Sequence, residues 1–150
     1  MHFNLDLTLI ERTLQRQGLH VQSAMVMPTL IREALQQNTY FVMTLEDSAK
    51  PSSEASGNDI TQETKDRFAV VVALRTVGDA TGGASTGIIG EAREKIKKEL
   101  VGLQIDGFDP IEYERGAPVR FETEKQILLY QMQFTVTRPV TSEVRHYGDC

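Results

Sequence analysis

The segment Asp66-Arg-Phe-Ala-Val-Val-Val-Ala-Leu-Arg75 contains one of the longest apolar runs of the chain, from Phe68 to Leu74. Valine and phenylalanine are enriched in strands, and a continuous apolar run places side chains of this kind on both faces of a sheet. The stretch from Phe68 to Val77 therefore predicts a strand in the centre of a sheet. Tyr40 to Leu45 has a similar composition and predicts a second strand.

The C-terminal third of the chain predicts further strands. Ile111 to Arg115 and Val119 to Thr123 are short runs of strand-forming residues. From Leu128 to Thr137 apolar residues alternate with glutamine and threonine, which is typical of a strand with one buried and one solvated face. Thr123 to Gln126 then predicts the hairpin turn before this last strand.

Helical periodicity appears in three other segments. Apolar residues recur at spacings of three and four residues from Phe3 to Leu14 and from Ile89 to Leu100, and Pro28 to Asn38 predicts a shorter helix between them. The order is helix, helix, strand, strand, helix, strands. It predicts an α+β fold with a mostly antiparallel sheet of about four to five strands and helices packed on one face.

Length and composition predict a single domain over residues 1–150, with an ordered core at about residues 3–138. Residues 46–65 are polar, with Ile60 almost the only hydrophobic side chain, and predict a long exposed loop. Such a loop is a candidate contact arm, and a tolerated disordered insertion is the open alternative. Gly78 to Gly87 predicts a flexible linker, and residues 139–150 predict a loose tail.

Charge and composition argue against several partners. The net charge is −5, and no run of Lys or Arg is longer than the one within Lys95 to Lys98, so nucleic acid is not a favoured partner. The apolar runs are far shorter than the roughly 20 residues that cross a bilayer. The N-terminus lacks the pattern of a signal peptide. Cys150 is the only cysteine and can close no intrachain disulfide.

A search for catalytic chemistry identifies no site. The Gly-rich stretch Gly78 to Gly87 lies between a strand and a helix, but it lacks the Gly-Lys-Ser/Thr ending of a phosphate-binding loop. The three histidines, His2, His20 and His146, are scattered and predict no metal site. No Gly-x-Ser-x-Gly elbow is present. We therefore predict no catalytic, cofactor-binding or metal-binding residue.

Carboxylates are frequent in the C-terminal hairpin region. Paired carboxylates can act as acid and base when burial separates their pKa values. Here they alternate with apolar residues, which places them on the solvent side of the strands. A negative face of this kind repels DNA and would keep a channel wall from binding it. The residues are Asp106, Asp109, Glu112, Glu114, Glu122 and Glu124.

The order of these segments resembles the tail terminator proteins of long-tailed phages. Asp66 to Arg75, followed by Asp79 and the Gly/Ala linker, is similar to the central strand of that family. The helix of that family is similar to Ile96-Lys-Lys-Glu-Leu-Val-Gly-Leu103. Its Gly-aromatic-x-Pro corner is similar to Gly107-Phe-Asp-Pro110. Leu129-Tyr-Gln-Met-Gln-Phe-Thr-Val136 is similar to its closing strand. The resemblance covers roughly residues 3 to 138.

The resemblance implies a virion structural protein and not an enzyme. Such a protein binds the end of the growing tail tube as a ring, expected to be a hexamer, stops tube polymerisation and offers a surface for head attachment. Its partners would be further copies of itself, the major tail tube protein and the head–tail connector protein. It would lie at the tail end next to the head, after assembly in the host cytoplasm. Two alternatives remain open. The chain could be another phage neck or tail structural protein, such as a head–tail connector, or a small ligand-binding or enzymatic α+β domain.

A ring requires two different patches on each subunit, so that one subunit binds the next around the circle. Mobile exposed segments can become ordered against a partner, which favours the polar loop and the Gly/Ala linker. The residues expected at the protein interface are Asp47, Lys50, Glu54, Asp59, Lys65, Asp79 and Ser85.

Overall fold

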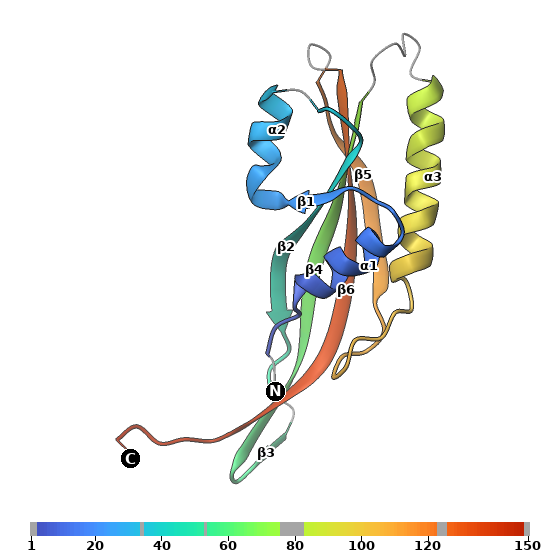
Figure 1. Cartoon of the computed structure of the whole chain (residues 1–150). Coiled ribbons are helices and arrows are strands. Elements are labelled where there is room, and N and C mark those ends of the chain that lie inside the picture. The colour runs from blue at the N-terminus through green and yellow to red at the C-terminus, as the bar shows by residue number, and fades with distance from the viewer. Residues whose placement is uncertain (1–2, 34, 53, 76–82, 123–125, 149–150) are drawn as a thin grey trace.

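The computed structural model describes residues 3–33, 35–52, 54–75, 83–122 and 126–148, with the backbone alone at 54–56, 83–86 and 120–122. A long twisted sheet has helices beside one end and extends well beyond them at the other (Figure 1). The elements in chain order are α1 (Leu7–Arg16), β1 (Val21–Ser23), η1 (Ala24–Val26), α2 (Met27–Glu33), β2 (Thr39–Ala49), β3 (Glu54–Ser56), β4 (Asp59–Arg75), α3 (Gly83–Leu100), β5 (Glu112–Glu122) and β6 (Ile127–Glu143).

The strands within these described residues form one six-stranded sheet. Its order is β1-β2-β4-β6-β5, and β3 pairs with β4 outside this path. β1 is parallel to β2, and the other pairs are antiparallel. β4 lies between β2 and β6, and its register with β6 runs from Asp59 opposite Glu143 to Arg75 opposite Ile127. The predicted α+β class, the mostly antiparallel sheet and the central position of the Phe68 strand are confirmed.

One face of the sheet carries the larger hydrophobic core. Successive side chains of a strand point to opposite faces, and the even-numbered apolar residues of β4 face α1 and α3. Phe68 stacks on Phe134 with a ring-centre distance of 5.3 Å, and Tyr113 meets the Phe134 ring edge-on at 5.4 Å. Ile10 of α1 and Ile96 of α3 are fully buried against this face. Each of the two helices is therefore held against the sheet by the burial of its own apolar stripe.

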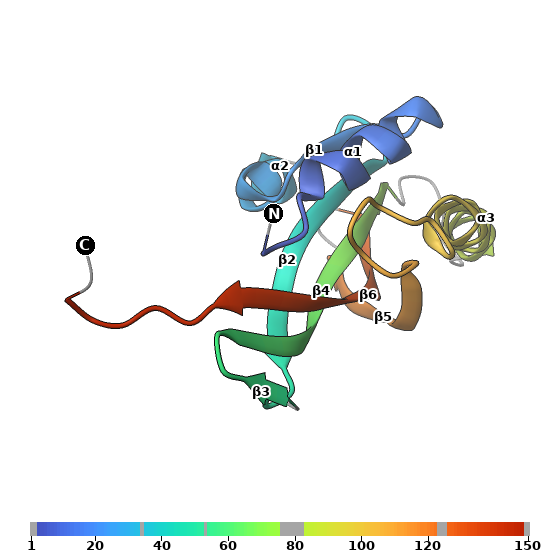
Figure 2. The ribbon, with the colours of Figure 1, turned by 90° about the horizontal axis from the view of Figure 1, so that it is seen from below.

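The second helix lies on the opposite face, which differs from the expectation of helices on one face only. Met27, Leu30 and Ile31 pack against a smaller cluster that includes Phe41 and Val71. Figure 2 shows α2 and α3 on opposite sides of the sheet. The difference has a simple cause, because the odd-numbered residues of the central strands are apolar too and need a cover on their own side.

The segment at residues 46–65 is not a loop, so that prediction was wrong. β2 continues to Ala49, and β4 begins at Asp59, which leaves a short turn around β3. The polar residues of this segment bury little surface. They are held by pairing with the distant end of β6, for example Thr61 opposite Thr141. Hydrogen bonding between strands, and not hydrophobic periodicity, orders this part of the chain.

Smaller differences concern the ends of elements. The two short strands predicted within 111–123 are one strand, β5, with register shifts between Tyr113 and Arg115 and between Pro118 and Arg120. The tail predicted from residue 139 begins later, since β6 continues to Glu143. The part of the Gly/Ala linker from Gly83 onward belongs to α3, and residues 76–82 lie outside the described residues, as do 123–125 of the predicted turn.

Candidate protein–protein interface

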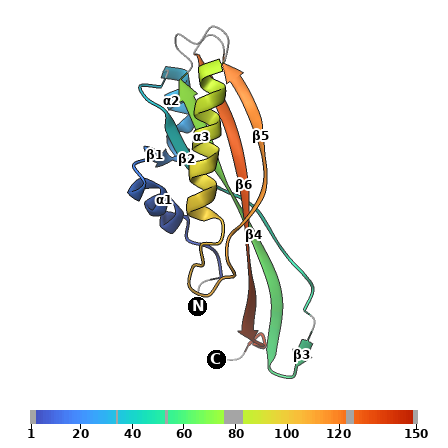
Figure 3. The ribbon, with the colours of Figure 1, turned by 90° about the vertical axis from the view of Figure 1, so that its right-hand side faces the viewer.

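The far end of the sheet projects beyond the helices and is called the arm here. The arm consists of residues 46–49 of β2, β3, residues 59–67 of β4 and residues 137–143 of β6. Figure 3 shows the ends of β4 and β6, together with β3, extending past the last turns of α1 and α3. The described helices therefore do not cover this part of the sheet.

Backbone pairing gives the arm a defined shape. The N–H of Lys50 donates to the carbonyl of Glu63 at 2.9 Å, and the N–H of Val144 donates to the carbonyl of Asn58 at 2.7 Å. The hydroxyls of Thr61 and Thr141 lie 2.9 Å apart across β4 and β6. Paired strands order these groups before any partner binds, which lowers the entropy lost on association.

Polar contacts join the arm to the body of the protein. The Arg67 guanidinium lies 3.3 Å from the Glu114 carboxylate of β5, and both side chains are partly shielded from solvent. The Asp66 carboxylate accepts a hydrogen bond of 2.9 Å from the N–H of Leu5, just before α1. The arm is therefore fixed at its base to two other elements.

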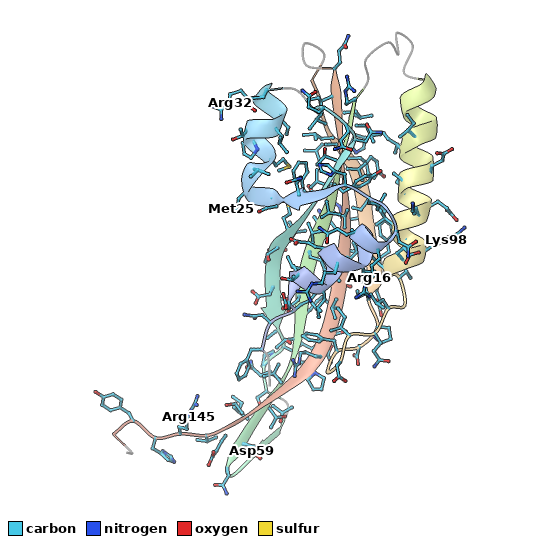
Figure 4. All side chains as sticks on the ribbon, viewed as in Figure 1. Arg16, Met25, Arg32, Asp59, Lys98 and Arg145 are labelled. Atoms are coloured by element: carbon cyan, nitrogen blue, oxygen red, sulfur yellow. The ribbon has the colours of Figure 1, made fainter. Side chains whose placement is uncertain are left out.

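Five of the seven predicted interface residues lie on or beside the arm, and Figure 4 shows Asp59 near its tip. The Lys50 ammonium lies 3.5 Å from the Glu63 carboxylate, but both side chains are largely exposed, so the pair adds little stability. Lys65 is half-buried, and the carboxylates of Asp47 and Asp59 are exposed. Glu54 pairs with Thr61 through the backbone, and its side chain is not described. The five residues are Asp47, Lys50, Glu54, Asp59 and Lys65.

The other two predicted residues belong to the linker before α3 and to α3 itself. Asp79 lies outside the described residues. Ser85 belongs to the first turn of α3, whose start lies at the opposite end of the molecule from the arm (Figure 1). Ser85 and the polar segment therefore do not form one patch on a single subunit.

A hollow of about 320 Å³ on one face of the arm was not predicted, and we call it the arm hollow. Phe3, with 55% of its surface exposed, and Ile60, with 41% exposed, lie along it together with Val140. Asp47 and Asp66 add carboxylates to the same hollow. The helical spacing of Phe3 suggested a core residue, but Phe3 precedes α1 and stays at the surface. The sequence feature that indicated this hollow was Ile60, an isolated hydrophobic residue in a polar segment.

A second hollow, of about 540 Å³, lies between the start of α1 and the loop that follows α3, and we call it the α1 hollow. Leu9, Ile105 and Phe108 provide apolar surface. The Arg138 guanidinium lies over the Phe108 ring at 4.6 Å, a cation–π contact that holds the ring in place. Asp6 and Asp106 contribute exposed carboxylates. The Asp6 carboxylate also caps α1 by accepting a hydrogen bond of 3.0 Å from the N–H of Thr8.

No three His, Cys, Asp or Glu residues come together as a metal site within the described part of the chain. The carboxylates of the C-terminal hairpin region that are described, Asp106, Asp109, Glu112 and Glu114, are exposed as predicted. Burial raises the pKa of the Tyr113 phenol, and the neighbouring Tyr130 adds to this rise. In the described helices we find no span long and apolar enough to cross a membrane.

Comparison with known proteins identifies the family to which the chain belongs. The family model described as "Phage tail terminator protein" matches residues 4–144. Among solved structures, a chain of the "Virion of native gene transfer agent (GTA) particle" is similar at 16% sequence identity, covering 71% of this chain and 72% of that chain, with a TM-score of 0.43, which is too low to support a conclusion. No curated protein matches. Because the family model spans the sheet, the helices and the arm, the chain belongs to the phage tail terminator family, a family of structural proteins of the phage tail.

Proposed function

We propose that this protein caps the end of the phage tail tube as a ring of six copies. In this proposal the ring stops addition of further tube subunits by covering the end on which they would bind. The opposite side of the ring offers a surface to the head–tail connector. The protein would act at the tail end next to the head after assembly in the host cytoplasm.

The observation that carries the proposal is the family match over residues 4–144, together with an arm that extends beyond the described helices. A cap needs a surface that is rigid before binding, because ordering a flexible segment weakens association. The paired strands of the arm provide such a surface, and Asp47, Lys50, Glu54, Asp59 and Lys65 would supply its polar contacts. The arm hollow would supply apolar area through Phe3 and Ile60.

The arm also has the charge expected of a specific docking surface. The arm contains three cationic residues, Lys65, Arg67 and Arg138, and seven carboxylates, so 3 − 7 gives a formal charge of −4. The carboxylates are those of Glu46, Asp47, Glu54, Asp59, Glu63, Asp66 and Glu143. Electrostatic complementarity favours correct partners and disfavours incorrect ones. The tube protein is therefore expected to present basic residues at the end that the arm contacts.

Purified protein added to polymerising tube protein tests the proposal. Tube length is measured by negative-stain electron microscopy over a series of molar ratios. The expected result is a mean length that falls as the ratio rises, with a ring at one end of each tube. An unchanged length distribution at saturating protein contradicts capping. Binding to the isolated head–tail connector without any effect on tube length would instead favour a neck protein.

A further inference from the structure

The segment after β6 leaves the body of the subunit. At its start, the N–H of Val144 donates a hydrogen bond to the carbonyl of Asn58. The Tyr147 side chain is fully exposed, and Arg145 is exposed and makes no ion pair with the described residues. Figure 4 shows Arg145 beyond the end of β6, far from the helices. An exposed arginine and an exposed tyrosine therefore lie two residues apart on a segment that extends beyond the sheet.

Tyrosine and arginine are the residues that most often dominate the energy of protein interfaces. A tyrosine contributes most binding energy where its ring is buried against apolar surface while its hydroxyl stays near water. An arginine contributes most binding energy beside a carboxylate to which its planar guanidinium can donate hydrogen bonds. A site for residues 144–148 therefore needs an apolar floor with carboxylates at its edge.

The α1 hollow has these properties. Leu9 and Ile105 leave apolar surface uncovered beside the Phe108 ring, which Arg138 already holds from one side. The carboxylates of Asp6 and Asp106 are exposed at the same hollow. The exposed carboxylate of Asp106 carries the charge that complements Arg145.

The segment does not reach the hollow of its own subunit. In both Figure 1 and Figure 2 it runs away from the loop that follows α3. Five residues, 144–148, span at most about 17 Å when fully extended, which is the reach of the segment toward a neighbouring subunit. The segment and the hollow are different patches, which is the requirement for a ring of identical subunits.

We propose that Arg145 and Tyr147 of one subunit bind in the α1 hollow of the next subunit, with Tyr147 on the apolar floor and Arg145 beside Asp106. This inference rests on the proposed ring, and it identifies the contact that closes it. Each subunit gives one segment and receives one, so the contact repeats around the ring. The tube-binding arm and the ring contact are then separate surfaces of one chain.

Cross-linking from Cys150 tests the contact in the full-length protein. Cys150 is the only cysteine, so a benzophenone maleimide can be attached there alone. It lies three positions after Tyr147, a reach of about 10 Å. The labelled protein is irradiated in solution and on tail tubes, and cross-linked peptides are identified by mass spectrometry after mixing with an isotope-labelled copy. We expect intermolecular cross-links to residues 4–9 or 103–109. Intramolecular cross-links, cross-links to other segments of the partner, or none in both samples would overturn the proposal.

Charge reversal makes the test specific. Arg145→Glu and Asp106→Lys are each expected to reduce the yield of these cross-links at least tenfold, and the double variant to restore most of it. Asp106 is chosen because changing Asp6 would also remove the cap of α1. His146→Ala is the matched control, since it alters the same segment without touching either proposed contact. Equal yields from wild type and both single variants would contradict the pairing.

Tube length separates this inference from the proposed function. Protein that shortens tubes while its cross-links fall elsewhere leaves the cap intact and overturns the ring contact. Protein that forms the expected cross-links without shortening tubes supports the ring contact and overturns the cap.

Discussion

Replacement of Thr61 by proline tests whether the arm is a paired strand. Thr61 lies in β4 between two partners, opposite Glu54 of β3 and Thr141 of β6. Proline has no N–H and holds φ near about −65°, whereas antiparallel strands prefer about −140°. Proline is therefore poorly tolerated within a strand that is paired on both sides. In a polar loop the same change would cost little.

The size of the effect follows from the contacts. Loss of a backbone hydrogen bond costs about 1 kcal/mol, and loss of the hydroxyl contact between Thr61 and Thr141 costs about as much. The forced backbone dihedral adds about 1 kcal/mol. A total of about 3 kcal/mol raises the population of the open arm on the order of 100-fold. The core of the sheet is unaffected, because neither hydrophobic cluster contains a residue of 46–67 or 137–143.

Hydrogen exchange followed by mass spectrometry measures this directly. Thr61→Pro should raise exchange in residues 59–66 and 137–143 and leave residues 68–74 unchanged. Thr61→Val is the control, because it keeps the backbone and the preference for strand and loses only the hydroxyl contact. Unchanged exchange in the proline variant would refute the reasoning, since it would show that residues 59–66 do not pair with β6 in solution.

Three further predictions concern the core, the arm and the pH dependence. Phe134→Ala should lower the free energy of unfolding by about 3–5 kcal/mol in urea titrations, because Phe134 is fully buried between two aromatic rings, and a loss below about 1 kcal/mol would contradict that packing. Ile60→Asp should abolish shortening of tubes while the protein stays folded, whereas Ile88→Asp, a similarly exposed isoleucine on α3, should still shorten them. Burial raises the pKa of the Tyr40 phenol above its ordinary value of 10.0. The neutral phenol therefore contributes stability that is complete below pH 10 and is lost as the pH rises through the folded-state pKa. Tyr40→Phe should accordingly flatten the decline in the free energy of unfolding above pH 10, measured by urea titration at several pH values.

Elements with strong hydrophobic periodicity could be predicted from the sequence. The Phe68 strand and the helix from Ile89 to Leu100 are both present, since burial of their apolar residues determines them. The alternation from Leu128 to Thr137 also predicted its buried residues from Met132 to Val136 correctly. The parallel strand β1 was missed, because three residues carry no pattern long enough to identify a strand.

The arm could not be predicted in the same way. Residues 59–66 are polar on both faces, so no period of two appears in their hydrophobicity. Their strand structure comes from pairing with residues 137–143, some 80 positions later. The local sequence does not identify a pairing partner at that distance. The exposure of Asp47, Lys50 and Asp59 could be predicted, because composition marks exposed segments. Phe3 and the α1 hollow were missed because hollows form between elements that are distant in the sequence.

The length of tail tubes assembled without this protein shows whether it caps them. Tails are imaged by electron microscopy in lysates of the phage that encodes this protein, with the gene intact and with the gene deleted. We expect overlong, headless tubes without the gene, and a return to normal length when purified protein is supplied during assembly. Tubes of normal length in the deletion lysate would contradict capping and place the protein in another part of the particle.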